Sequence, residues 1–92
     1  MPVRESYVER EIRKYAVKHG FTFIKLMGMK GIPDRMVLGP GKVVAFLEVK
    51  RPGQKPTPIQ QYRLKSLRDL GFTATWVDNI DDGKQFIKEL KL

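Results

Sequence analysis

Residues 31–51 read GIPDRMVLGPGKVVAFLEVKR, and this stretch constrains the fold more than any other part of the chain. Two runs rich in branched apolar residues, RMVL at 35–38 and KVVAFLEVK at 42–50, flank a Gly-Pro-Gly turn. Branched residues favour extended backbone, and a tight glycine-containing turn between two such runs is typical of an antiparallel β-hairpin. The chain is therefore expected to fold around a β-sheet that contains this hairpin.

The two acids of this stretch, Asp34 and Glu48, lie near its two ends. A three-residue loop of residues 40–42 would pair position 34 with position 48, with the β-carbons about 5 Å apart. A two-residue loop would instead place Asp34 opposite Leu47. Because side chains alternate along a strand, Lys50 shares a face with Glu48.

Two adjacent carboxylates repel each other unless a cation lies between them, so the pair predicts a site for a hard divalent metal ion. Such an ion would polarise a phosphate and lower the pKa of a bound water, while the ammonium group of Lys50 stabilises developing charge. This combination suits phosphodiester hydrolysis. The structural alternative is a surface ion pair between Glu48 and Lys50, worth at most about 1 kcal/mol.

Hydrophobic periodicity and turn residues divide the rest of the chain into further elements. We expect helices at 4–19, 58–70 and 82–91, further strands at 21–27 and 72–77, and a loop at DNIDD, residues 78–82. The predicted order is α-β-β-β-α-β-α. A strand, helix, strand crossover after the hairpin favours parallel neighbours, so the predicted fold is α/β, a mixed β-sheet flanked by α-helices.

The length of 92 residues predicts a single domain spanning 1–92. No apolar stretch approaches the length of a membrane span or signal-peptide core, so we expect no membrane partner and an intracellular, cytoplasmic protein of a microbial or viral host cell. The chain has no cysteine, which excludes disulfides and thiolate metal sites. Any metal ion must therefore be bound by oxygen atoms or by the single histidine.

The formal charge of +8 is large for this length and predicts an anionic polymer as partner, with nucleic acid as the first candidate. Residues 25–68 carry ten basic side chains and two acidic ones, and these acids are Asp34 and Glu48. The central segment thus supplies the positive excess around the predicted metal site. The alternative explanation is a solvated face that only keeps the protein soluble.

Candidate phosphate contacts surround the hairpin. The loop with Gly28, Lys30 and Gly31 could bring backbone N–H groups to a phosphate, or its glycines could simply turn the chain. Side chains that could contact the DNA backbone, without base specificity, are those of Lys25, Arg35, Lys42, Arg51, Lys55, Arg63, Lys65 and Arg68. The aromatic residues Phe72 and Trp76, with Val77, are assigned to the core.

The sequence GIPDR followed by Glu48-Val49-Lys50 is similar to the PD-(D/E)xK nuclease signature, and the whole chain resembles a stand-alone VRR-NUC domain of that superfamily. The resemblance implies a restriction-endonuclease-like core and Mg²⁺- or Mn²⁺-dependent DNA cleavage by a metal-bound water. It implies Asp34, Glu48 and the backbone carbonyl of Val49 as metal ligands, and Lys50 as the catalytic lysine. One departure is Arg35, where many VRR-NUC sequences have an aliphatic residue.

The first predicted helix contains three acids, Glu5, Glu9 and Glu11, and its periodicity does not choose among them. The stretch VEREIRKYAVKHGF resembles the first helix of archaeal Holliday-junction resolvases. That register, counted back from the Gly-Phe pair, implies Glu9 as a further catalytic and metal contact, through water. Glu5 lies one helical turn away on the same face and stays open as the alternative.

Gln60 has two possible roles. Thr57-Pro58-Ile59-Gln60 is a capping box, in which Gln60 reaches back to the N–H of Thr57. Gln60 also lies on the apolar helical face, so it could point toward the metal site. VRR-NUC domains resemble this chain in having a glutamine at this position, which implies a catalytic role.

The predicted function is a Mg²⁺-dependent DNA endonuclease that recognises branched or Holliday-junction structure rather than sequence. Symmetric junction cleavage would require a C2 homodimer, and the apolar face of Phe86, Ile87 and Leu90 could form its interface or belong to the core. The alternatives are a non-catalytic basic nucleic-acid-binding module and an RNA-cleaving nuclease of the same fold.

Overall fold

The computed structural model describes residues 3–91, so residues 1, 2 and 92 of the predicted span lie outside the described part. Its elements follow the predicted order, α-β-β-β-α-β-α. In chain order they are α1 (Glu5–Lys18), β1 (Thr22–Lys25), β2 (Arg35–Gly39), β3 (Val43–Val49), α2 (Pro58–Asp69), β4 (Thr73–Val77) and α3 (Ile80–Leu90). The prediction of a mixed sheet flanked by helices is confirmed.

The four strands form one sheet in the order β1-β2-β3-β4. The first three are antiparallel neighbours, whereas β4 runs parallel to β3 because α2 carries the chain back before β4 begins. In the hairpin, Gly39 pairs with Val43, so residues 40–42 form the loop. This is the predicted three-residue loop. Arg35 pairs with Leu47, so the next position, Asp34, lies opposite Glu48.

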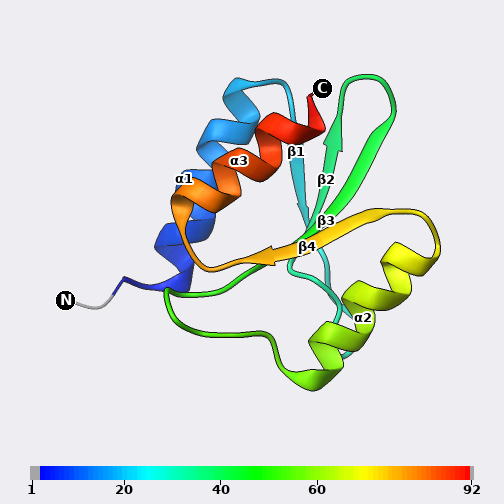
Figure 1. The fold of residues 1–92 in the computed structure, drawn as a ribbon. Helices are drawn as coiled ribbons and strands as arrows, with labels where there is room; N and C mark the ends of the chain where they lie inside the picture. The colour runs from blue at the N-terminus through cyan, green and yellow to red at the C-terminus, as the bar shows by residue number, and fades with distance from the viewer. Residues whose placement is uncertain (1–2, 92) are drawn as a thin grey trace.

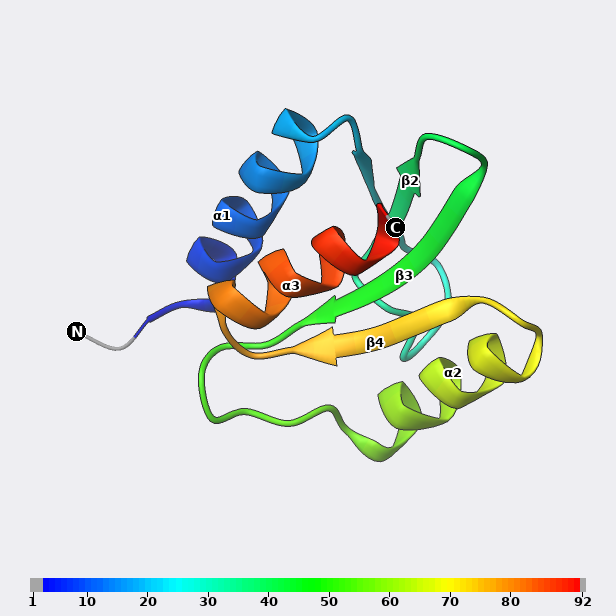
Figure 2. The ribbon, with the colours of Figure 1, turned by 45° about the horizontal axis from the view of Figure 1, so that its top comes forward.

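Helices cover both faces of the sheet, with α1 and α3 on one side and α2 on the other (Figures 1 and 2). The main core lies between the sheet and the α1–α3 pair, with Ile12, Leu47 and Ile87 fully buried. Gly83 lets the two helices approach closely, because a Cβ at this position would collide with the side chain of Ile12. No helix within residues 3–91 is long and apolar enough to cross a membrane.

The third helix begins earlier than predicted, because the DNIDD segment is a helix start and not a loop. The side chain of Asn79 accepts a hydrogen bond of 2.8 Å from the N–H of Asp82, which caps the helix. Asp81 and Asp82 lie in the first turn, where the helix dipole stabilises negatively charged side chains. The signal was a capping residue followed by acids, which outweighed the polar, turn-like composition.

The apolar face of α3 belongs to the core. Ile87 is fully buried, and Phe86 and Leu90 pack against the same cluster. Ile87 thus belongs to the core, whereas Phe86 and Leu90 are partly buried, and a dimer interface stays a prediction.

The core assignment of the β4 aromatics was wrong in part. Val77 is buried, but Trp76 is only half-buried and Phe72 is 40% exposed. The reason is that β4 is an edge strand and α2 alone covers that side of it. Phe72 precedes the strand and packs its ring edge-on against Phe46, with centroids 5.4 Å apart.

Candidate active site

The carboxylate of Asp34 is held at the point where the chain enters β2. Its Oδ2 accepts a hydrogen bond of 3.0 Å from the N–H of Val49 on β3. Its backbone carbonyl accepts one of 3.0 Å from the N–H of Leu26, which follows β1. Two neighbouring strands therefore fix the position of this acid, and the side-chain bond draws it toward the end of β3.

Glu48 and Lys50 are buried, with only 1% and 6% of their surfaces exposed. The Nζ of Lys50 lies 3.6 Å from Oε2 of Glu48. The two residues therefore form an ion pair, but it is buried and not on the surface. The other carboxylate oxygen, Oε1, is buried without a hydrogen-bond partner among the described residues. Burial without full pairing is costly for a charged group, so this side chain is either strained or part of a site.

The electrostatics of Glu48 reflect this position. Burial, and next the negative charge of Asp34, raise the pKa of Glu48 from 4.5 to about 8. The ammonium group of Lys50 acts in the opposite direction but does not balance these effects. A proton or a metal cation is therefore strongly attracted to the pair of carboxylates.

The donor set fits a hard divalent cation such as Mg²⁺ or Mn²⁺. The two carboxylates interact electrostatically, and Oε1 of Glu48, which has no hydrogen-bond partner within residues 3–91, is an oxygen of the kind that such a cation binds. Within residues 3–91, no three or more His, Cys, Asp or Glu side chains cluster closely enough to enclose an ion. A cation here would complete its coordination with backbone oxygen and water, as Mg²⁺ commonly does.

Gln60 makes both of the contacts considered for it. Its Oε1 accepts a hydrogen bond of 2.9 Å from the N–H of Thr57, which completes the capping box. Its Nε2 lies 3.4 Å from Oε2 of Glu48 and donates to it. The amide therefore links the start of α2 to the buried carboxylate, and the two roles do not exclude each other.

The acids of α1 have different surroundings. Oε1 of Glu9 is 2.9 Å from Nε of Arg35 and 3.5 Å from Nε of Arg13, so Glu9 is paired with two cations. Burial and next the charge of Asp34 raise the pKa of Glu5. A cavity of about 260 Å³ beside the site is lined by residues that include Glu5, Glu9, Asp34 and Arg35. Glu5 is thus the helix acid that interacts with Asp34.

The ion pair between Glu9 and Arg35 was missed by sequence reasoning. Arg35 is the residue at which the chain departs from the family pattern, and its side chain is only 20% exposed. An unexpected arginine next to a predicted metal ligand could have been read as a signal for a partner acid on the helix. Arg35 therefore donates through Nε to Glu9, and a phosphate contact through its other guanidinium nitrogens stays a prediction.

Most of the other predicted phosphate contacts lie on α2 or in the loops before β2 and α2, whereas Lys25 lies on β1 and Lys42 in the β2–β3 loop. Nε of Arg63 donates a hydrogen bond of 3.0 Å to the carbonyl of Lys30, which ties the glycine-containing loop to the helix. Gly31 has a positive φ of 80° and lies against Ile59, where a Cβ would approach to 2.7 Å. Packing alone therefore accounts for this glycine. The exposed members of the predicted set are Lys25, Gly28, Lys30, Lys42, Arg51, Lys55, Lys65 and Arg68.

Comparisons with known proteins agree with this geometry. No protein-family model matches the chain. It is 35% identical over 81 residues to "Putative nuclease p44" of Acyrthosiphon pisum secondary endosymbiont phage 1, covering 86% of this chain and 87% of that protein. Its structure is similar to a solved "VRR_NUC domain" with a TM-score of 0.84 and 28% identity, covering 91% of this chain and 94% of the other.

A second solved structure, a "VRR_NUC domain protein", shares the fold with a TM-score of 0.81 at 19% identity, covering 98% of this chain and 89% of the other. The predicted resemblance is thus confirmed by sequence and by structure. The chain belongs to the VRR-NUC family of nucleases.

Proposed function

We propose that this nuclease is a Mg²⁺- or Mn²⁺-dependent endonuclease that hydrolyses DNA phosphodiester bonds at the site formed by Asp34 and Glu48. The observation that carries the proposal is the buried carboxylate of Glu48. It lies near a second acid, Asp34, and its Oε1 has no hydrogen-bond partner in the described part of the chain. When bound, a divalent cation would polarise the scissile phosphate and lower the pKa of water.

The residues of the site would divide the work. Asp34, Glu48 and the backbone carbonyl of Val49 would hold the cation. Lys50, whose Nζ lies 3.6 Å from Glu48, would place positive charge beside the phosphate as negative charge develops. Gln60 would keep the Glu48 carboxylate in position through its 3.4 Å contact.

The helix acid of the site would be Glu5. Its pKa is raised by burial and next by the charge of Asp34, whereas Glu9 is paired with Arg35 and Arg13. Glu9 would not contact the metal ion itself. It would help to position Asp34, because its ion pair with Arg35 stabilises the start of β2, directly after Asp34. The resemblance to the resolvases implies Glu9 as the metal contact. In this chain the contact would instead come from Glu5, one helical turn earlier.

The substrate would be DNA recognised through its backbone. The chain has a formal charge of +8, and the exposed Lys30, Arg51 and Lys55 lie in the loops that lead into and out of the site. Phosphate contacts of this kind read shape rather than base sequence, which favours branched DNA such as junctions over a sequence motif. A C2 homodimer would place two such sites on the paired strands of a junction.

A cleavage assay with end-labelled substrates tests this proposal. A four-way junction, a flap, a linear duplex and a single-stranded RNA are incubated with the protein and Mg²⁺ or EDTA. We expect Mg²⁺-dependent cuts in the branched DNA and none in EDTA. Preferential cleavage of RNA would support the RNA-cleaving alternative, and binding without cleavage of any substrate would support the non-catalytic module. Size-exclusion chromatography with light scattering on the junction complex tests the dimer.

A further inference from the structure

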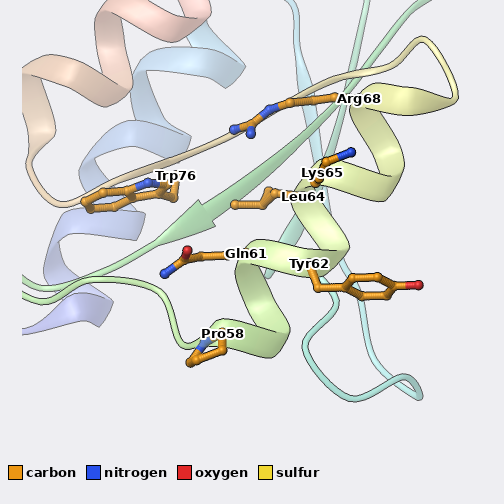
Figure 3. A pocket seen from close by; sticks show the side chains of 7 residues that line it. All are labelled: Pro58, Gln61, Tyr62, Leu64, Lys65, Arg68 and Trp76. Carbon is orange, nitrogen blue, oxygen red and sulfur yellow. The ribbon is translucent and has the colours of Figure 1, made fainter.

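A second and larger cavity, of about 630 Å³, lies between α2 and β4. Figure 3 shows Gln61 and Leu64 pointing from α2 toward Trp76 on β4, with the side chain of Arg68 above them. The ring of Tyr62, on the same helix, points the other way (Figure 3). Trp76 is therefore the aromatic ring that faces α2 across this cavity, Tyr62 also borders it, and Leu64 is its buried apolar wall.

The cavity adjoins the proposed catalytic site. Trp76 is the Cα partner of Glu48 in the parallel ladder between β3 and β4. Residues that pair in this way project their side chains from the same face, on strands about 4.8 Å apart. That face is the one covered by α2, since Gln60 reaches Glu48 from it. A DNA strand that crosses the proposed catalytic site toward β4 would therefore next contact Trp76.

Two cations border the cavity. Lys65 is exposed, and its Nζ lies 2.8 Å from Asp69, which neutralises part of its charge. Arg68 is held in place because its Nε donates to the carbonyl of Ala74 at 2.6 Å. The residues that line the cavity include both cations and no carboxylate. An apolar aromatic floor with a cationic rim is complementary to a base with its phosphate.

We propose that this cavity binds an unpaired nucleotide of the DNA substrate, with its base against Trp76 and its phosphate at Lys65 and Arg68. The inference rests on the proposed function, because it makes the cavity an extension of the catalytic site. Single-stranded nucleotides occur in flaps and at opened junctions, whereas a base in an intact duplex is stacked and cannot reach Trp76. The cavity would thus help to select branched DNA.

Trp76 is the only tryptophan in the chain, so its fluorescence reports directly on the cavity. The probe is an oligothymidylate of eight nucleotides, titrated into the wild-type protein in EDTA so that no cleavage takes place. We expect saturable quenching, since a stacked base quenches indole emission. A blunt duplex that binds with similar affinity, measured by anisotropy of a labelled strand, should cause little quenching.

Two charge reversals provide a matched comparison. Lys65→Glu should weaken oligothymidylate binding about tenfold, because it places negative charge at the phosphate. Lys18→Glu makes the same change in net charge on exposed α1, across the sheet from the cavity, and should weaken it less than about twofold. Thermal unfolding of both variants checks that they are folded.

The proposal is overturned by binding without quenching, by equal quenching with the duplex, or by equal weakening in the two variants. Failure of the nuclease proposal would look different. Quenching in a protein that cuts no substrate would support the nucleotide site while removing the enzyme. Cleavage of branched DNA without quenching would leave the nuclease and remove only the nucleotide site.

Discussion

The N–H of Val49 donates a hydrogen bond of 3.0 Å to Oδ2 of Asp34. This contact joins the last residue of β3 to the residue before β2 and keeps the Asp34 carboxylate beside Glu48. Oε1 of Glu48 has no partner of this kind among the described residues. Of the two neighbouring carboxylates, Glu48 is therefore the one whose negative charge is poorly stabilised. We expect the stability of the protein to depend on the protonation of Glu48 and on a bound metal ion.

The free energy of unfolding of the metal-free protein should fall as pH rises from about 4.5 to about 8. Because the folded protein raises the pKa of Glu48 to about 8, the folded state retains its proton over this range while the unfolded state releases it. Stability is full below pH 4.5, and the loss, roughly 2 to 4 kcal/mol, is complete above pH 8. The raised pKa of Glu5 acts in the same direction.

Thermal unfolding in EDTA between pH 4.5 and 9 measures this effect. Glu48→Gln should flatten most of the decline, whereas Glu89→Gln, at an exposed position of α3, should leave it unchanged. An unaltered decline in Glu48→Gln would show that the buried carboxylate is not its source.

Mn²⁺ should stabilise the wild-type protein at pH 8, because the cation satisfies both carboxylates. At a concentration one hundred times Kd, the gain is about 2.7 kcal/mol, which raises the melting temperature by roughly 10 to 20 °C in a chain of this length. Asp34→Asn should lose this shift. Glu11→Gln, which removes an acid paired with Lys14 on α1, should retain it. Equal shifts in the two variants would place the metal ion elsewhere.

Thr57→Ala and Gln60→Ala separate the two roles of Gln60. Each breaks the capping box, so each should lower stability by about 1 kcal/mol. Only Gln60→Ala also removes the donor to Glu48, so only this variant should slow cleavage, by about tenfold or more. Chemical denaturation and single-turnover cleavage measure the two effects. Similar cleavage rates in both variants would reduce Gln60 to a helix cap.

Glu5→Gln and Glu9→Gln distinguish the two acids of α1. Glu5→Gln should weaken the Mn²⁺ stabilisation and slow cleavage, because it removes the acid that interacts with Asp34. Glu9→Gln should instead lower stability by about 1 kcal/mol through loss of its pair with Arg35, while the shift produced by Mn²⁺ persists. The reverse outcome would restore Glu9 as the metal contact.

These acids also show where prediction from sequence stops. The hairpin and its turn were predictable, because both are local, but the sequence left a two-residue and a three-residue loop open, and the structure has the three-residue loop. The choice between Glu5 and Glu9 was not predictable, since it depends on how α1 is rotated against the sheet. That rotation is set by packing between residues far apart in the chain, such as Ile12 and Gly83.

The limits at Gln60 and Trp76 are similar. The capping box was visible in the sequence, but the contact between Gln60 and Glu48 depends on where α2 lies over the sheet. Trp76 was assigned to the core because a large aromatic in a strand is usually buried. Its place beside a cavity follows from the edge position of β4, which sequence patterns of single elements do not reveal.

Single-turnover cleavage of a labelled four-way junction by wild type and Asp34→Asn, with Mg²⁺ and with EDTA, tests the central claim most directly. Asp34→Asn is nearly isosteric and can still accept the hydrogen bond from Val49, so the fold should persist. We predict cleavage by the wild type only with Mg²⁺, and a rate at least about a thousandfold lower in Asp34→Asn. Equal cleavage by the two proteins, or undiminished cleavage in EDTA, would contradict a metal-dependent site at Asp34 and Glu48.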